Sequence, residues 1–553
     1  YQKGIDRMRI DRISIKNYRR LADVDLDVRE HLVLIGANDV GKTSFLRLID
    51  LVLGSTAHLY QRISIEDLRS VEEKLIAEVR FRDFSDAERA LFYREIDIAS
   101  KVRETDIPEE TLRVRLEVEQ DPDDDQSVII RRWCPGRGEE RNPSREQINA
   151  FGWRYLPATR QVSASSIEGP NGVIQALLQA VEPELGAEKE KLVSLLESFN
   201  KKLEENASIV NLRHGMADRL SSSMPRSINA DDLAVRTSTE PSESVLEDAS
   251  VYFKHDGTYA SITEQSDGIR QLISMTLFDL AENAANVVAI DEPEIHLHPQ
   301  SQRTVAKLLS GSFNQKIIVT HSPYIVQRFD PTQIVVVRPD GSCKQIDSCE
   351  SPNAALQAHW WNPKMLEALT ARYVIVVEGV ADQVVVEAAA HAKGILLDKI
   401  GAVIFELGGA EKFPNLHKFL GSNGFEVKVL GLVDEKEKGK WLGAFGGRPK
   451  NVIDKSVFIS TSDLEDEYCQ GIPVDVIVDR LIANHVANDE QAIFASCKVN
   501  DKESITPEHL AKYCRNNKVP AALAITRNLT QTETASISSI HRLLTELERL
   551  SEQ

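Results

Sequence analysis

Hydrophobic and polar residues alternate along the N-terminal part of the chain with a period of two, which is the pattern of half-buried β-strands. The alternating runs lie at residues 8–15, 24–28, 77–81 and 112–118, and a less regular run lies at 128–133. The acidic residues 121–125 indicate a solvated hairpin turn, with a metal site as the less favoured alternative. Together the runs predict an antiparallel sheet.

Uninterrupted apolar runs predict buried strands. Such runs lie at 32–35, 287–290 and 317–319, and a further strand with a polar exit is predicted at 155–160. From about residue 172 to residue 210 the period becomes helical, and one stripe carries the apolar residues Leu192, Leu195, Leu196, Phe199 and Leu203. We expect an inserted helical arm whose stripe pairs with a second copy of the chain or packs on the parent domain.

A second α/β pattern begins near residue 366. Apolar runs with polar ends lie at 372–379, 403–409, 427–434 and 457–460, with helical segments between them. Strands that alternate with helices predict a parallel sheet. We therefore expect an α/β protein with these parts: residues 8–168 and 246–347 of a first domain, its inserted arm and loop at 169–245, a linker at 348–365, and a second domain with C-terminal helices at 366–553.

The apolar run at 32–35 leads directly into the sequence GANDVGKT at 36–43, a complete G-x-x-x-x-G-K-[ST] phosphate loop. Its glycines let backbone N–H groups close around phosphate oxygens, and the N-terminus of the next helix adds a favourable dipole. Lys42 is expected to reach the β and γ phosphates of ATP, and Thr43 to bind Mg²⁺. The other expected nucleotide-binding residues of the loop are Asn38, Gly41 and Ser44.

Three later motifs extend this nucleotide site. Ser266 and Gly268 open an amphipathic run, and His321 follows a predicted strand. Asp291 and Glu292 follow the apolar run at 287–290. Asp291 is expected to hold Mg²⁺, directly or through water, and Glu292 to orient or deprotonate the attacking water.

Taken in chain order, residues 36–43, Ser266 with Gly268, Asp291 with Glu292, and His321 resemble four motifs of RecF- and SMC-like ABC ATPases. These are the phosphate loop, the signature, the Walker B motif and the switch His. The resemblance implies that Arg19 or Arg20 contacts the nucleotide. It also implies that the signature of one protomer completes the ATP site of another, so we expect a homodimer or a larger even assembly such as a tetramer. His296 and His298 are interpreted as part of a subunit-contact loop rather than as a metal pair.

Carboxylates follow or end the predicted strands of the second domain, and sites in parallel sheets lie at the C-terminal ends of strands. The residues expected to converge there are Glu378, Asp382, Asp434, Asp463 and Glu465. A carboxylate cluster without His or Cys favours Mg²⁺ or Mn²⁺. A two-metal site of this kind would activate water and stabilise both oxygens of a phosphodiester displacement.

This second unit resembles the Toprim domain of primases, topoisomerases and some nucleases. An ATPase followed by Toprim, with Glu465 after the fourth strand, is similar to the OLD (overcoming lysogenisation defect) family over nearly the whole chain. The resemblance implies a DNA endonuclease, with Glu378 as metal ligand or base and Lys518 stabilising charge on the scissile phosphate. It also implies a role in defence against phage, with a separate helicase as in the Gabija branch, or a retron component, as a partner.

One departure from the Toprim pattern concerns the third strand. Toprim domains usually carry Asp-x-Asp there, whereas this chain has Asp434, Glu435 and Lys436. One metal contact is therefore lost, or it is supplied by Glu435, Glu437 or the later acidic loop.

Composition changes this picture at three points. The 553 residues carry a net charge of −19, which disfavours nucleic acid overall but leaves room for a local basic groove. The six cysteines are scattered without a C-x-x-C motif, which fits reduced thiols in the cytoplasm and argues against a zinc site. No apolar run approaches the roughly 20 residues that span a bilayer, so no membrane association is expected.

Two other functions compete with the endonuclease. The first is a RecF-like, ATP-driven DNA-binding or repair clamp in which the acidic domain is structural. The second is a topoisomerase, which needs a nucleophilic Tyr on a winged-helix unit, and Tyr468 has no such context. The carboxylate cluster is the feature that distinguishes the endonuclease from the clamp.

Overall fold

The computed structural model describes residues 8–98, 109–136, 141–157, 185–186, 188–223, 229–232, 252–255, 258–261, 266, 268, 270, 285–311, 314–346, 363–422, 424–446 and 448–552. The chain divides into two compact units, Tyr1–Trp153 with Lys316–Gln553 and Arg154–Gln315, which we describe in turn. Residues 348–362 of the predicted linker, and most of the predicted loop before residue 245, lie outside the described residues.

An antiparallel sheet opens the first unit, with the strand order β2-β1-β4-β6-β5 and with β7 also paired to β6. The strands are β1 (Arg9–Lys16), β2 (Val24–Asp27), β4 (Leu75–Arg82), β5 (Asp97–Ile98), β6 (Glu110–Asp121) and β7 (Asp124–Trp133). Every pair of neighbours is antiparallel, as the alternating runs predict. The acidic turn joins β6 to β7.

A second group of strands in this unit carries the phosphate loop, in the order β14-β13-β3-β12. The strands are β3 (Leu32–Gly36), β12 (Gln315–Val319), β13 (Ile334–Val337) and β14 (Cys343–Gln345). β3 lies between β12 and β13, is parallel to both, and is buried along its whole length. The helices of this part are α1 (Lys42–Leu53), α2 (Thr56–Arg62), α3 (Asp86–Leu91), α4 (Arg145–Ala150), α11 (Pro323–Val326) and α13 (Pro363–Thr370).

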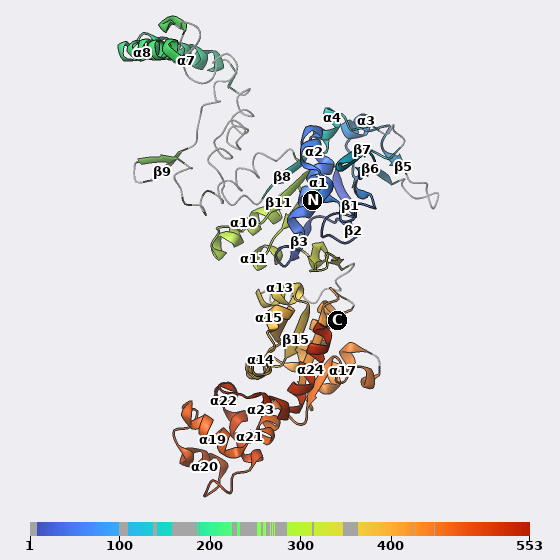
Figure 1. Ribbon diagram of the computed structural model, residues 1–553, viewed down its shortest axis with the longest axis vertical. Helices are drawn as coiled ribbons and strands as arrows, with labels where there is room; N and C mark the ends of the chain where they lie inside the picture. Colours follow the sequence, from blue (N-terminus) through green and yellow to red (C-terminus); the bar gives the residue numbers. More distant parts are fainter. Residues whose placement is uncertain are drawn as a thin grey trace. The chain divides into compact units, whose positions relative to one another are not determined.

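The second unit contains the Walker B strand and the helical arm. Its elements are β8 (Trp153–Leu156), α7 (Glu188–Glu204), α8 (Ala207–Ser223), β9 (Tyr252–His255), β10 (Thr258–Ser261), β11 (Val287–Asp291) and α10 (Pro299–Gly311). β8 begins two residues before the strand predicted at 155–160, and it neighbours β11. The arm helices α7 and α8 contact one another (Figure 1). Among the described residues no helix is long and apolar enough to cross a membrane.

A four-stranded parallel sheet forms the centre of the C-terminal domain in the first unit, with the order β16-β15-β17-β18. The strands are β15 (Tyr373–Val377), β16 (Ala402–Glu406), β17 (Lys428–Asp434) and β18 (Val457–Ser460). The prediction of four parallel strands is thus confirmed. The helices connecting these strands are α14 (Val380–Lys393), α15 (Leu397–Ile400), α16 (Phe413–Leu420) and α17 (Lys438–Phe445).

Seven helices follow the last strand of this sheet. They are α18 (Leu464–Gly471), α19 (Val474–Ala483), α20 (Glu490–Cys497), α21 (Pro507–Asn516), α22 (Lys518–Thr526), α23 (Gln531–Ser536) and α24 (Ser538–Ser551), in red and orange in Figure 1. The apolar faces of all of them except α23 form one core with α14 and with residues of β15, β17 and β18. α14 packs against α22, so the helix that begins with Lys518 lies beside the helix that carries Asp382.

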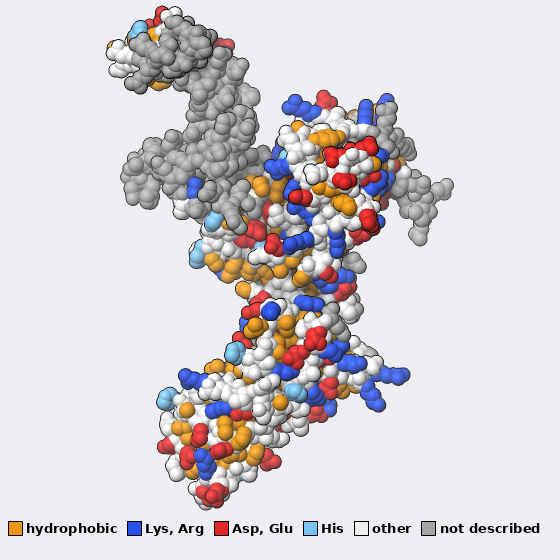
Figure 2. Space-filling view, viewed as in Figure 1, with side chains coloured by type: hydrophobic (Ala, Val, Ile, Leu, Met, Phe, Trp, Pro, Cys, Tyr) orange, Lys and Arg blue, Asp and Glu red, His pale blue; other side chains and the backbone are white. Residues whose placement is uncertain are grey.

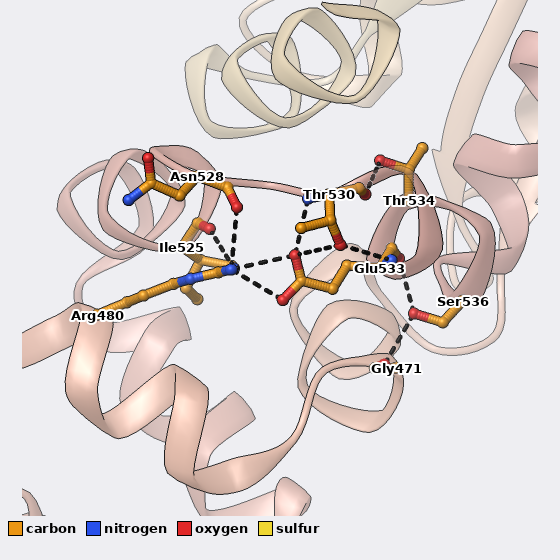
Figure 3. Close-up of polar contacts among 8 residues, drawn as sticks. All are labelled: Gly471, Arg480, Ile525, Asn528, Thr530, Glu533, Thr534 and Ser536. Carbon is orange, nitrogen blue, oxygen red and sulfur yellow. Dashed lines mark hydrogen bonds and ion pairs between the residues drawn. The ribbon is translucent and has the colours of Figure 1, made fainter. Parts of the chain in front are cut away.

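A polar network fixes the far end of α22 (Figure 3). The guanidinium of Arg480 donates to the carbonyl oxygens of Ile525 (2.9 Å) and Asn528 (3.1 Å) and to the carboxylate of Glu533 (2.8 Å). Glu533 also accepts hydrogen bonds from the backbone N–H and hydroxyl of Thr530. The network therefore ties α19 to the loop between α22 and α23.

Candidate functional site

The phosphate loop has the backbone geometry that its glycines predict. Gly41 has φ 105°, and a Cβ atom there would lie 3.0 Å from a Leu21 methyl carbon, so both conformation and space favour glycine. Lys42 is the first residue of α1 and is 5% exposed. Its Nζ donates to the carbonyl oxygens of Gly36 (3.1 Å) and Ala37 (2.6 Å). The ammonium group is thus held inside the loop, where phosphate is expected.

A cavity of about 430 Å³ adjoins this loop. Its walls come from the loop, from the segment after β12 and from α13, and they comprise Ile35, Gly36, Ala37, Asn38, Thr320, His321, Pro323, Pro363, Leu366, Glu367 and Thr370. The cavity therefore brings together Asn38 and His321, which are 283 positions apart and were both predicted to bind nucleotide.

The structure distinguishes the two arginines that follow β1. Arg19 donates from Nε to the buried carboxylate of Asp67 at 2.6 Å. Arg20 instead donates to the backbone oxygen of Asp39, inside the phosphate loop, at 3.4 Å. Arg20 is therefore the better candidate for a nucleotide contact.

The second unit carries the remaining nucleotide motifs. Asp291 ends β11 and is 1% exposed, and Glu292 follows it with a left-handed φ of 47°. The signature residue Gly268 lies against the loop after Walker B, because a Cβ atom there would be 2.9 Å from the carbonyl oxygen of His296. His298 accepts a hydrogen bond at Nδ1 from the backbone N–H of Gln300 in the first turn of α10.

Three carboxylates meet at the C-terminal ends of β15 and β17. The backbone N–H of Asp434 donates to Glu378 Oε1 at 3.2 Å, so the ends of the two strands are joined directly. Asp382 lies in the first turn of α14 and accepts from the backbone N–H of Gly379 at 3.0 Å. Ser460, the register partner of Asp434 on β18, donates from its hydroxyl to Asp434 Oδ1 at 3.0 Å.

These carboxylates hold protons more tightly than free ones do. Burial, followed by the charges of Glu378 and Asp382, raises the pKa of Asp434 to about 7. Burial, with smaller contributions from Glu465 and Glu378, raises the pKa of Asp382 to about 6. Burial also raises the pKa of Glu378. Negative charge is therefore concentrated at this edge of the sheet, and Lys518 offsets only part of it.

The two predicted ligands after β18 differ in their surroundings. Asp463 caps α18 and accepts two hydrogen bonds from Arg515, at 2.6 and 3.0 Å. Burial, the largest single influence, raises the pKa of Asp463, but the bonds from Arg515, the backbone N–H of Asp466 and nearby positive charge together lower it. Glu465 is 3% exposed and lies 3.6 Å from Lys518 Nζ. Burial alone would lower the pKa of Lys518, but Glu465, Asp382 and the other carboxylates raise it. The ammonium group thus belongs to the carboxylate site.

The segment after β17 bears on the missing second Asp of the Toprim pattern. Glu435 is paired with Lys438, whereas Glu437, paired with Lys440 at 3.0 Å, also raises the pKa of Glu378. Glu437 is therefore the better-placed substitute of the two. Lys436 itself is exposed.

Sequence reasoning missed two supporting residues, Ser460 and Arg515. Ser460 could have been found from the sequence, because it is a polar residue at the end of an otherwise apolar strand, beside Asp434. Arg515 lies on α21, 52 positions from its partner Asp463, and only the tertiary fold brings them together. Glu467, also buried, serves the fold by accepting from the backbone N–H of Thr461 and the hydroxyl of Ser539.

The donor chemistry of this site fits a hard divalent cation, because every ligand is a carboxylate oxygen and their mutual repulsion would be relieved by positive charge. Within the described residues, no group of three or more His, Cys, Asp or Glu side chains could hold a metal ion by itself. Mg²⁺ is commonly held by one or two carboxylates, with waters and substrate phosphates completing its shell. Glu378 and Asp434 could supply such a pair.

Comparison with known proteins gives matches in both parts of the chain. A family model described as "AAA domain, putative AbiEii toxin, Type IV TA system" matches residues 32–327, and one described as "Overcoming lysogenization defect protein-like, TOPRIM domain" matches residues 369–435. Endonuclease GajA of Bacillus cereus is 21% identical over 425 residues, 73% of this chain and 71% of that protein. The OLD nuclease of Thermus scotoductus is 47% identical over 45 residues, 8% of each chain.

Two solved structures match parts of the chain. The C-terminal region of the Burkholderia pseudomallei OLD protein matches with 21% identity and a TM-score of 0.28, over 33% of this chain and 98% of that one. An Smc head domain from Pyrococcus furiosus matches with 17% identity and a TM-score of 0.34, over 61% of this chain and 96% of that one. From its matching family models, the chain belongs to the AAA domain family and carries an OLD-like TOPRIM domain after the ATPase.

Proposed function

We propose that the protein is a nucleotide-regulated, metal-dependent DNA endonuclease that nicks DNA or cuts both strands. The observation that carries the proposal is the meeting of Glu378, Asp382 and Asp434 beside Lys518 at the C-terminal edge of a parallel sheet. The named functions of two relatives, an endonuclease and an OLD nuclease, support the same reaction class.

In this proposal each residue has a defined task. Glu378 and Asp434 hold Mg²⁺ or Mn²⁺, which when bound supplies an activated water and charge stabilisation. Lys518 donates to a non-bridging oxygen of the scissile phosphate and stabilises the charge that develops there. Asp382 and Glu465 keep Lys518 protonated, because both raise its pKa. Arg515 holds Asp463 and so positions the start of α18 rather than leaving Asp463 to bind metal.

ATP chemistry is assigned to the first domain. Asn38, Gly41, Lys42, Thr43, Ser44 and His321, with Ser266 and Gly268 of a second protomer, hold the nucleotide; Asp291 holds its Mg²⁺, and Glu292 activates water. The same arrangement calls for a homodimer or tetramer. We further propose a role in defence against phage, with a helicase or a retron component as partner.

The test is cleavage of plasmid and linear DNA with Mg²⁺ or Mn²⁺, with and without ATP. Removing a metal ligand or the Lys charge typically costs several kcal/mol of transition-state stabilisation, so Glu378→Ala, Asp434→Ala and Lys518→Ala should each lower cleavage by about 10³ or more while ATP hydrolysis persists. Asp398→Ala removes an exposed carboxylate from α15 and serves as the matched control. Cleavage that survives in Glu378→Ala would refute the assignment.

The RecF-like clamp is the second candidate. It is favoured by the replacement of the second Toprim Asp by Lys436, which removes one metal contact. ATP-dependent DNA binding without cleavage, under any of the metal conditions above, would support the clamp over the nuclease.

A further inference from the structure

The connection from β17 to β18 is strongly basic in an otherwise acidic chain. We call residues 436–455 the basic segment. It contains six cationic side chains, Lys436, Lys438, Lys440, Arg448, Lys450 and Lys455, against two acidic ones, Glu437 and Asp454. The whole chain carries a net charge of −19, so this segment reverses the overall sign locally.

Several of these cations are available to an outside partner. Lys436, Arg448 and Lys450 are exposed, and in the part of the chain that the structure describes they have no ion-pair partner. Lys438 and Lys440 are engaged by Glu435 and Glu437 at the first turn of α17. In Figure 2, Lys and Arg side chains project from the surface where Figure 1 places α17.

The basic segment begins at the carboxylate site. Lys436 is two positions after Asp434, and the backbone N–H of Glu437 donates to the carbonyl oxygen of Asp434 at 3.0 Å. The pKa of Lys440 is raised by Glu437 and, to a smaller extent, by Glu378. The first turn of α17 is therefore within electrostatic reach of the proposed metal ligands.

Aromatic packing anchors the segment to the sheet. Trp441 is fully buried, stacks on Phe413 with ring centroids 3.9 Å apart, and donates from Nε1 to the carbonyl oxygen of Ala410 at 3.1 Å. Its ring covers Gly431 of β17 so closely that a Cβ atom there would lie 2.7 Å away. Lys438 and Lys440, on the same helix as Trp441, are thus carried on a firmly packed support, which lowers the entropy lost on binding.

We propose that the basic segment binds the phosphate backbone of duplex DNA and guides one strand to Glu378 and Asp434. The proposal rests on the nuclease function proposed above and names its substrate-binding surface. The eight residues of α17 span about 12 Å, a length of duplex that carries about seven phosphates. Contacts to the backbone alone orient DNA without reading its sequence.

The test is duplex binding in EDTA, which separates binding from cleavage. Fluorescence anisotropy of a labelled 30-base-pair duplex is recorded for the full-length protein at several salt concentrations. Arg448→Glu with Lys450→Glu should weaken binding about tenfold or more and reduce the slope of log K against log salt by about two. Lys399→Glu with Lys512→Glu makes the same charge change at exposed positions on α15 and α21 and should leave both quantities near wild type.

A second measurement locates the surface without substitution. Acetylation of exposed lysines, read by mass spectrometry, should show Lys436 and Lys450 protected by duplex DNA and Lys399 and Lys512 unprotected. This surface would be overturned if the double variant Arg448→Glu with Lys450→Glu bound duplex as tightly as wild type. It would also be overturned if only Lys399 and Lys512 were protected. Either result would leave the nuclease proposal standing. A wild-type protein that binds no duplex in EDTA would also overturn this surface, and the cleavage assay with Mg²⁺ or Mn²⁺ would decide the nuclease proposal separately.

Discussion

Asp434 links the protonation of the metal-free site to the stability of the fold. Its pKa rises from 3.8 to about 7 in the folded chain, through burial and the charges of Glu378 and Asp382. A carboxyl group with a raised folded pKa stabilises the fold below its unfolded pKa, and that stability is lost as the pH rises through the folded value. The loss therefore falls between about pH 4 and pH 7.

We expect Asp434→Asn, which mimics the protonated form, to raise the melting temperature of the metal-free protein by about 2–5 °C at pH 8 and by less at pH 5. Thermal unfolding followed by circular dichroism in EDTA measures the change. Asp398→Asn is the control and should leave the melting temperature unchanged at both pH values. Adding Mg²⁺ at pH 8 should stabilise wild type more than Asp434→Asn. An equal shift at both pH values would contradict the charge-based explanation.

Glu292 is the residue on which ATP turnover is expected to depend. It follows the buried Asp291 and has a left-handed backbone, a conformation that residues other than glycine adopt at some cost. Glu292→Gln should retain nucleotide binding and lower phosphate release by 10² or more, because the amide cannot accept a proton. Binding of a fluorescent nucleotide and phosphate release are measured together. Phosphate release at the wild-type rate would mean that another group activates the water.

Residue positions were predictable from sequence where the signal is local, whereas side-chain partners were not, because residues distant in the sequence decide them. The phosphate loop and the strand-end carboxylates each belong to a short motif of consecutive residues. Arg19 and Arg20 could not be separated, because the difference lies in Asp67, which is 48 positions from Arg19. The tie between Arg515 and Asp463 escaped prediction for the same reason.

Among the elements, the arm helix α7 presents an apolar face. Leu195 is 65% exposed and Phe199, one turn further on, is 51% exposed. Apolar side chains spaced by four positions on a helix favour pairing with another helix. We expect Leu195→Glu with Phe199→Glu to reduce the assembly to a smaller species in analytical ultracentrifugation. Glu197→Lys with Ser198→Glu on the same helix is the control, and a wild type that sediments as a monomer with and without ATP would refute the pairing.

The Arg480 network is an element-scale support for Lys518. Arg480 and Glu533 are each 14% exposed at the side chain, so removing Arg480 leaves a largely buried Glu533 carboxylate without its ion-pair partner. Arg480→Met should lower the free energy of unfolding by about 2–4 kcal/mol and lower cleavage, while ATP hydrolysis persists. Urea unfolding and both activity assays test this, with Arg527→Met, which removes an exposed arginine, as control. Unaffected stability would mean that the network contributes little to holding α22.

Element types were well predicted because strand and helix periods are repeated over many residues. The four parallel strands of the TOPRIM domain and the antiparallel sheet of the ATPase follow directly from them. Boundaries were less accurate. β8 begins at Trp153, two residues before the predicted strand, and the indole N–H of Trp153 donates to Asp50 at 2.9 Å, a contact that no local pattern reveals.

For the whole molecule, net charge does not indicate where the proposed DNA-binding surface lies. The net charge of −19 sums an acidic majority of the chain and the basic segment. The basic segment matters because of its place directly after Asp434. The electrostatic potential at a binding site is set by the nearest charges, because salt screens charges that are more than roughly 10 Å away. The composition of one connection therefore says more than that of the chain.

Helix α13 makes the two catalytic parts unsuitable as interchangeable modules. It lines the cavity at the phosphate loop with Leu366, Glu367 and Thr370, and its strand β15 leads to Glu378. A fragment cut before residue 363 would have an open-sided nucleotide pocket. A fragment that begins there would lose the contacts of α13 with β3 and β13. Any exchange of ATPase or TOPRIM parts between relatives must therefore carry α13 together with the surfaces on both of its sides.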